Sequence, residues 1–68
     1  MTTALKIDGM TCDHCRRAVK EALESVGGVA HAEVDLVAGT ASVAHEPNVD
    51  RNALVAAVAQ EGYSAKVA

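Results

Sequence analysis

The residues of this chain whose types and spacing suit chemistry are its two cysteines, Cys12 and Cys15. They lie in the stretch Gly9-Met10-Thr11-Cys12-Asp13-His14-Cys15, after which apolar residues recur every third or fourth position instead of every second. The pair is therefore expected where a loop enters a helix. Free amide N–H groups and the positive end of the helix dipole favour deprotonated sulfur at such a place. We interpret the stretch as a loop that holds one soft metal ion.

Two thiolates with no third strong ligand nearby in the sequence restrict the choice of metal. Structural zinc sites use about four ligands in a tetrahedron, and His31 and His45 are expected on strands, as surface residues. Soft thiolates select Cu(I) among the common intracellular ions. Cu(I) accepts two ligands in a near-linear arrangement, and Hg(II) fits for the same reason. The alternatives are a redox-active dithiol and a pair of buried small hydrophobic side chains.

The elements that must position this loop follow from the apolar spacing. Alternation predicts strands at 3–8, 29–36, 40–45 and 63–67. The strand at 29–36 is expected to turn Ala30 and Leu36 inward, and the strand at 63–67 to place Tyr63, Ala65 and Val67 on one face. A helical stripe begins at Cys15 and ends before Gly27-Gly28, with Asp13 as a first-turn acid or N-cap. Asp50 is expected to cap a second helix at 51–61. The order β-α-β-β-α-β predicts an α+β, ferredoxin-like fold in which one four-stranded antiparallel sheet carries both helices on one face.

Composition limits the function. The 68 residues suffice for one small domain, 1–68, and its core lacks Phe and Trp and has a single Tyr. A large dry substrate pocket is therefore not expected, which argues against most classes of enzyme. The net charge of −3 gives no sign of nucleic-acid binding. With no leader peptide and no membrane span, we expect a cytoplasmic protein, where thiols stay reduced.

Half of the basic residues nevertheless follow the cysteines directly: Arg16, Arg17 and Lys20. On a helix, Arg16 and Lys20 share one face, with Arg17 beside them. The cluster is either a docking surface for a partner with acidic residues or an ordinary solvated face. We also expect Cys12 to be the more exposed and more acidic thiol, because Cys15 begins the apolar stripe.

The seven residues from Gly9 to Cys15 resemble the GMTCxxC signature of the heavy-metal-associated domain family, and Gly28-Val29 and Gly62-Tyr63 extend the resemblance over the chain. The family comprises copper chaperones and the N-terminal domains of copper-transporting P-type ATPases. The resemblance implies that Cys12 and Cys15 are the Cu(I) ligands, that Met10 is buried under the loop and that Tyr63 neighbours the metal. Zinc-exporting relatives often carry Asp where this chain has Thr11, and mercury-binding periplasmic relatives carry a leader.

The function that the resemblance implies is that of a cytoplasmic Cu(I) chaperone. It would deliver the ion to a metal-binding domain of a copper-transporting P-type ATPase by thiolate exchange, without being an enzyme. Ag(I), Hg(II) and Zn(II) are expected to bind in vitro, and the cysteines with His14 would support a Cu(I)-bridged homodimer. His14 is otherwise an exposed loop residue.

The first alternative is that the chain is itself the N-terminal domain of such an ATPase. The alternative from another class is a thiol–disulfide oxidoreductase, which a C-x-x-C beside a strand–helix–strand pattern allows. The absence of any Trp and the Asp-His dipeptide between the cysteines argue against this alternative.

Overall fold

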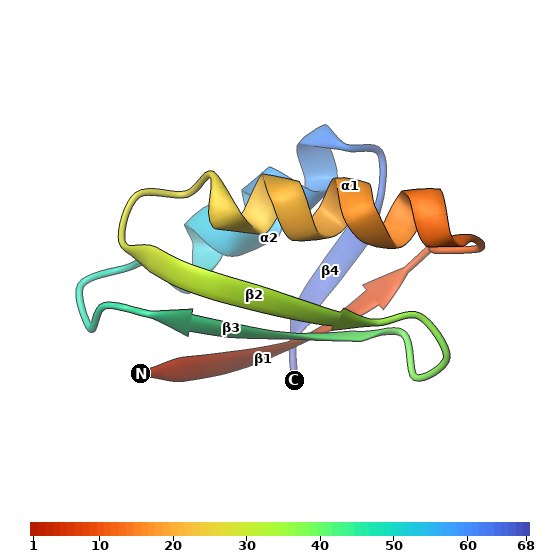
Figure 1. The fold of residues 1–68 in the computed structure, drawn as a ribbon. Helices are drawn as coiled ribbons and strands as arrows, with labels where there is room; N and C mark the ends of the chain where they lie inside the picture. The colour runs from red at the N-terminus through yellow and green to blue at the C-terminus, as the bar shows by residue number, and fades with distance from the viewer.

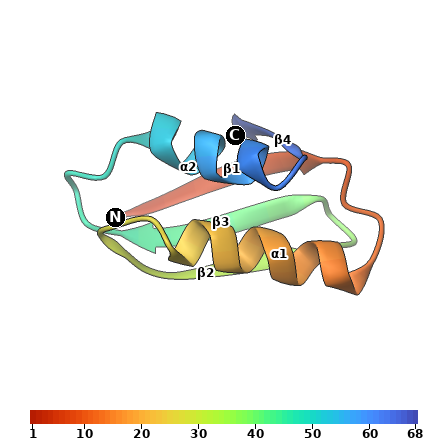
Figure 2. The same ribbon diagram turned by 90° about the horizontal axis from the view of Figure 1, so that it is seen from above.

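Two helices lie on one face of a four-stranded antiparallel sheet in the computed structural model, which describes residues 1–68 (Figures 1 and 2). The elements in chain order are β1 (Thr2–Asp8), α1 (Asp13–Glu24), β2 (Val29–Asp35), β3 (Thr40–His45), α2 (Arg51–Gln60) and β4 (Ser64–Val67). The strand order across the sheet is β2-β3-β1-β4. This confirms the predicted ferredoxin-like fold. Neither helix is long and apolar enough to cross a membrane.

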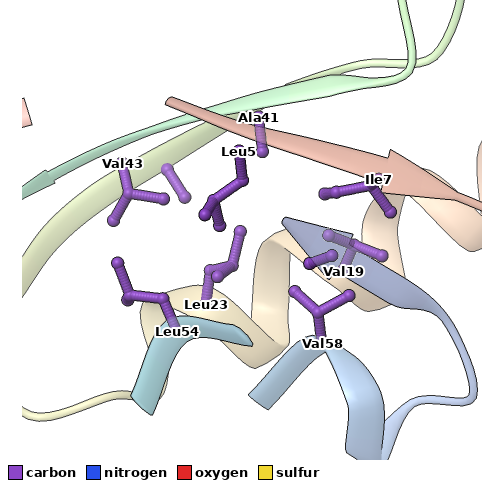
Figure 3. Packing of buried hydrophobic residues seen from close by; sticks show 10 residues of the cluster. Leu5, Ile7, Val19, Leu23, Ala41, Val43, Leu54 and Val58 are labelled. Atoms are coloured by element: carbon purple, nitrogen blue, oxygen red, sulfur yellow. The ribbon is translucent and has the colours of Figure 1, made fainter. Parts of the chain in front are cut away.

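The core fills the space between the sheet and the two helices (Figure 3). Alternation along β1 turns Leu5 and Ile7 toward the helices, and the neighbouring strands add Ala32, Ala41, Val43 and Ala65. The helices contribute Val19 and Leu23 from α1, and Leu54 and Val58 from α2. Burying a Leu or Val side chain fully is worth about 1.5–3 kcal/mol. This core holds β1 and α1 together, and the cysteine loop is the connection between them.

The starts of the two helices differ. Asp50 caps α2 as predicted, since its carboxylate accepts a hydrogen bond of 2.8 Å from the backbone N–H of Asn52. In α1 the N-cap is Cys12, whose side chain makes no capping hydrogen bond. Asp13 is therefore the first-turn acid and not the cap. Because Asp13 is already helical, α1 begins two residues before the apolar stripe that starts at Cys15.

His45 is the clearest error of the sequence prediction, because it is buried (6% exposed) and not on the surface. It continues the inward alternation of Ala41 and Val43. Its Nδ1 lies 2.7 Å from the Glu46 carbonyl oxygen and its Nε2 lies 2.6 Å from Thr3 Oγ1. A carbonyl can only accept, so Nδ1 carries the proton and Nε2 accepts from the Thr3 hydroxyl. Both nitrogen atoms of the buried ring are thus hydrogen-bonded.

The outer strands also depart from simple alternation. The pairing of β2 with β3 shifts between Val29 and His31, so the intervening Ala30 is exposed where it was expected inside. Leu36 lies beyond the end of β2 and is half-buried. Val67 pairs with Leu5 at the end of the edge strand β4 and remains 44% exposed. His31 is exposed, as predicted.

Candidate metal site

The cysteine loop and the connection from α2 to β4 meet at one end of the sheet. Gly9 follows β1 with φ of 98°, a left-handed conformation that favours glycine. A Cβ atom on Gly9 would lie 3.3 Å from Tyr63 Cδ1, so the tyrosine ring packs on the glycine backbone. Glycine at this position therefore lets residue 63, distant in sequence, stand beside the cysteines.

The two sulfur atoms are neighbours and neither is in a disulfide. Cys12 Sγ lies 3.4 Å from Cys15 Sγ. Cys12, at the helix cap, is exposed, and Cys15, in the first turn, is partly covered, as predicted. No third His, Cys, Asp or Glu side chain joins them in a group that could hold a metal ion. The chain therefore offers two sulfur donors at this place.

The acidity of the thiols differs from the prediction. The pKa of Cys15 is lowered from 9.0 to about 6, mainly by a hydrogen bond from the Thr11 backbone and then by hydrogen bonds from the Tyr63 hydroxyl and the Cys12 thiol. The same contact raises the pKa of Tyr63, because the hydroxyl stabilises the thiolate by keeping its proton. The expectation of a more acidic Cys12 considered only the helix start. Donors to the Cys15 sulfur, first the Thr11 backbone of the same loop and then the Tyr63 hydroxyl from another loop, lower its pKa instead.

The remaining residues expected around the cysteines fall into two groups. Met10 and Tyr63 are half-buried and pack against the hydrophobic core, so both anchor their loops. Thr11 and His14 are exposed. Thr11 contributes its backbone to Cys15, whereas the His14 side chain forms no hydrogen bond or ion pair. The structure thus brings Tyr63 and Thr11 to the sulfurs and leaves His14 in solvent.

The basic cluster on α1 is largely paired within the helix. Arg16 Nε lies 2.8 Å from Asp13 Oδ1, and Arg17 Nε lies 3.7 Å from Asp13 Oδ2. Lys20 Nζ lies 2.9 Å from Glu24 Oε2. The hydrogen bond from Arg16 also lowers the pKa of Asp13. The sequence analysis missed this role of Asp13, although the i,i+3 and i,i+4 spacing of Asp13 to the two arginines is the signal for it.

Comparison with known proteins shows which family and which relatives the chain resembles. The model of the heavy-metal-associated domain family matches residues 4–64. A mercuric reductase from Serratia marcescens is 53% identical over 66 residues, which are 97% of this chain but 14% of that protein. The copper chaperone CopZ from Staphylococcus haemolyticus is 40% identical over 63 residues, with 91% of this chain and 93% of CopZ covered.

Solved structures agree with the sequence relatives. A copper-binding domain from HMA7, a P-type ATPase, superposes with a TM-score of 0.95 at 31% identity and covers 98% of this chain and 92% of that chain. The chain spans about one seventh of the length of the mercuric reductase named above. By its fold, its cysteine loop and the family match over most of its length, the chain belongs to the heavy-metal-associated domain family.

Proposed function

We propose that residues 1–68 act as one non-catalytic domain that binds a single Cu(I) ion through Cys12 and Cys15 and delivers it to a metal-binding domain of a copper-transporting P-type ATPase. The observation that carries the proposal is the pair of sulfurs 3.4 Å apart at an exposed helix start, with no third ligand beside them. Soft thiolates favour Cu(I). A two-ligand site in an exposed loop leaves the ion open to an incoming sulfur.

The lowered pKa of Cys15 prepares the site for metal. A thiol with a pKa of about 6 is mostly thiolate at neutral pH and can bond the ion without first losing a proton to solvent. The Thr11 backbone and the Tyr63 hydroxyl hold this sulfur. Cys15 is therefore the sulfur that captures the ion and stays in place.

The sulfur separation indicates which cysteine moves. If each metal–sulfur bond is about as long as the 2.3 Å of zinc–thiolate bonds, a linear S–metal–S unit needs the sulfurs about 4.6 Å apart, more than the observed 3.4 Å. Because Cys15 is held, Cys12 swings outward. A partner thiolate then adds to the ion and the bond from the ion to Cys12 breaks. A second partner thiolate displaces Cys15, and both cysteines of this chain are left as free thiolates.

Docking of the partner is proposed to use α1 beside the loop. The three cations of the cluster are offset by Asp13 and Glu24, so the patch is only weakly positive. Arg17 has the most exposed side chain of the three, 72%, and the longest ion pair. It is the residue best placed to reach an acidic partner. Such steering changes association rates and is screened over about 8 Å at physiological salt.

The relatives support copper as the cargo. CopZ of Staphylococcus haemolyticus is a copper chaperone of nearly the same length, and the HMA7 domain binds copper as part of a P-type ATPase. The same chemistry would serve a free chaperone in the cytoplasm, which we propose, and a domain at the N-terminus of an ATPase. Both would exchange Cu(I) with a similar pair of thiolates.

A second candidate cargo is Hg(II), and the specific observation in its favour is the 53% identity with a mercuric reductase. Hg(II) also accepts two thiolates in a line. In that case the chain would present Hg(II) to a reductase that completes the chemistry. The two candidates share the site and differ in the acceptor.

The experiment that tests the proposal is anaerobic transfer from the reduced, loaded protein. Cu(I) binding is first measured against a Cu(I) chelator and against Zn(II), with the variant Cys12→Ser/Cys15→Ser as control. The Cu(I)-loaded chain is then mixed with a P-type ATPase metal-binding domain, and the Hg(II)-loaded chain with a mercuric reductase that lacks its matching segment. Faster transfer than from a small dithiol carrier supports that acceptor. Chelator-resistant Cu(I) in the double Ser variant would overturn the site.

A further inference from the structure

The face of the sheet turned away from the helices is bare, as Figure 1 shows below the strands. Its middle is made of small outward side chains, Ala4 on β1 and Thr40, Ser42 and Ala44 on β3. A shallow hollow of about 560 Å³ opens along β3 and β2 and is lined in part by Ala4, Ser42 and Glu33. The middle of this face therefore has small side chains around one shallow hollow, and few of these side chains would lose conformational freedom on contact.

Charge on this bare face is divided between its two sides. The strand pairing aligns one row across the whole sheet, in the order Asp35, Thr40, Lys6, Lys66. Glu33 lies two residues from Asp35 on the same face, so the β2 side is acidic. Lys6 and Lys66 stand directly opposite each other, and neither forms an ion pair, since all three ion pairs lie within α1. Asp8 stands on the same face, two residues beyond Lys6 and opposite Ser64, so the side of β1 and β4 carries two positive charges and one negative charge. Like charges directly opposite on a sheet repel.

We propose that the bare face of the sheet docks on the same face of a second copy of this chain. The argument is charge complementarity under a two-fold axis parallel to the strands. That axis places β2 of each copy over β4 of the other, so Asp35 and Glu33 face the lysine pair twice. An axis across the strands, with the two faces fully overlapping, would keep β1 over β1 and set Lys6 over Ala4 and Asp8 over Thr2, where no opposite charges meet. Charge thus selects one of the two arrangements.

The size of the face sets the strength of this dimer. The longest dimensions of the chain, 31 × 20 Å, limit the buried face to about 600 Å² per copy, below the roughly 800 Å² of a stable interface. The dimer is therefore weak, forms at high local concentration and dissolves in salt. Its geometry keeps both cysteine loops at the same end of the pair, outside the interface. It needs no metal and does not depend on the proposed function.

The test is a concentration series of the reduced, metal-free chain at low and at high salt. Sedimentation equilibrium measures the oligomeric state, and amide NMR shifts identify the residues in contact. We expect concentration-dependent shifts at Ala4, Ser42 and Lys66, and loss of the dimer at high salt. Lys66→Glu should weaken association about tenfold. Arg51→Glu, an equal charge change at the start of α2, should not. A monomer at every concentration, or shifts confined to the cysteine loop as in a metal-bridged dimer, would overturn the proposal.

A charge exchange sharpens the test. The variant Lys6→Glu/Lys66→Glu carries an all-acidic face, and Glu33→Lys/Asp35→Asn carries a basic one. Asn at position 35 can still accept the turn hydrogen bonds that Asp35 receives from Val37 and Ala38. Each variant alone should be monomeric, and their mixture should associate more tightly than the unaltered chain. No association in the mixture of two folded variants would contradict the arrangement.

Discussion

Replacing Tyr63 by Phe removes one hydroxyl and keeps the ring that packs on Gly9. Three hydrogen bonds, from the Thr11 backbone, the Tyr63 hydroxyl and the Cys12 thiol, account for most of the lowering of the Cys15 pKa from 9.0 to about 6. Loss of one donor to a charged sulfur should raise that pKa to about 7. The thiolate fraction at pH 7 would then fall from about nine tenths to about one half. Capture of a soft metal near neutral pH should slow in proportion.

The assay is an NMR titration of the metal-free protein with ¹³C-labelled cysteine, in which the Cβ shift of Cys15 is followed against pH. Ser64→Ala is the matched control, because it removes a hydroxyl one residue away on the other face of the sheet. An unchanged Cys15 pKa in Tyr63→Phe would refute the reasoning. Tyr63 would then serve only to pack its loop.

Three further predictions follow from the site and the core. Cys12→Ser/Cys15→Ser should lose chelator-resistant Cu(I) yet keep the circular dichroism of the fold, since the core lies apart from the loop, and an unfolded variant would contradict this. Arg16→Glu/Arg17→Glu/Lys20→Glu should slow copper transfer at low salt and weaken the salt dependence of the transfer rate, with little change in Cu(I) affinity. Arg17→Glu alone should give most of this effect. Unchanged transfer rates in stopped-flow measurements would mean that the cluster is only a solvated face. Thr3→Val should lower the free energy of unfolding by about 1–3 kcal/mol, because it leaves the buried Nε2 of His45 without a hydrogen-bond partner. Denaturant unfolding measures this change, and unchanged stability would contradict the prediction.

The lowered pKa of Cys15 also predicts how stability depends on pH. Between about pH 6 and 9 the unfolded chain holds a proton on Cys15 that the folded chain has released. Stability of the metal-free protein should therefore rise with pH across this window, with the contribution of this thiol complete above pH 9 and lost below about 6. Urea midpoints measured at several pH values test this. In Tyr63→Phe the rise should be smaller.

Local patterns were enough to predict most of the fold. Alternation at Leu5 and Ile7 gave β1, and the stripe through Val19 and Leu23 gave α1, because burial of one face is what both elements require. His45 was misplaced because its polarity was given more weight than its position after Ala41 and Val43. The bulge at Ala30 arises from pairing with another strand, which no local pattern records.

The sequence predicted where the two cysteines lie in the fold, but it did not predict the electrostatics around them. The cysteine pair and the exposure of Cys12 follow from its place at the helix start. The lowered pKa of Cys15 comes first from the Thr11 backbone, four residues away, and then from Tyr63, which reaches Cys15 only through the fold. The charge of the basic cluster was overestimated because the ion pairs of Asp13 and Lys20 were not counted.

The cap of α1 has a consequence for the dynamics of the empty domain. A helix that begins with Ser, Thr, Asp or Asn gains about 1 kcal/mol from the capping side chain, and Cys12 provides no such bond. The first turn is thus the part of α1 most ready to fray, and its amides should exchange with solvent faster than those around Val19. A bound ion that joins Cys12 to Cys15 would hold this turn together and reduce its fraying. The first turn of α1 would then be more rigid in the loaded protein than in the empty protein. Slower amide exchange in this one turn would distinguish the two forms.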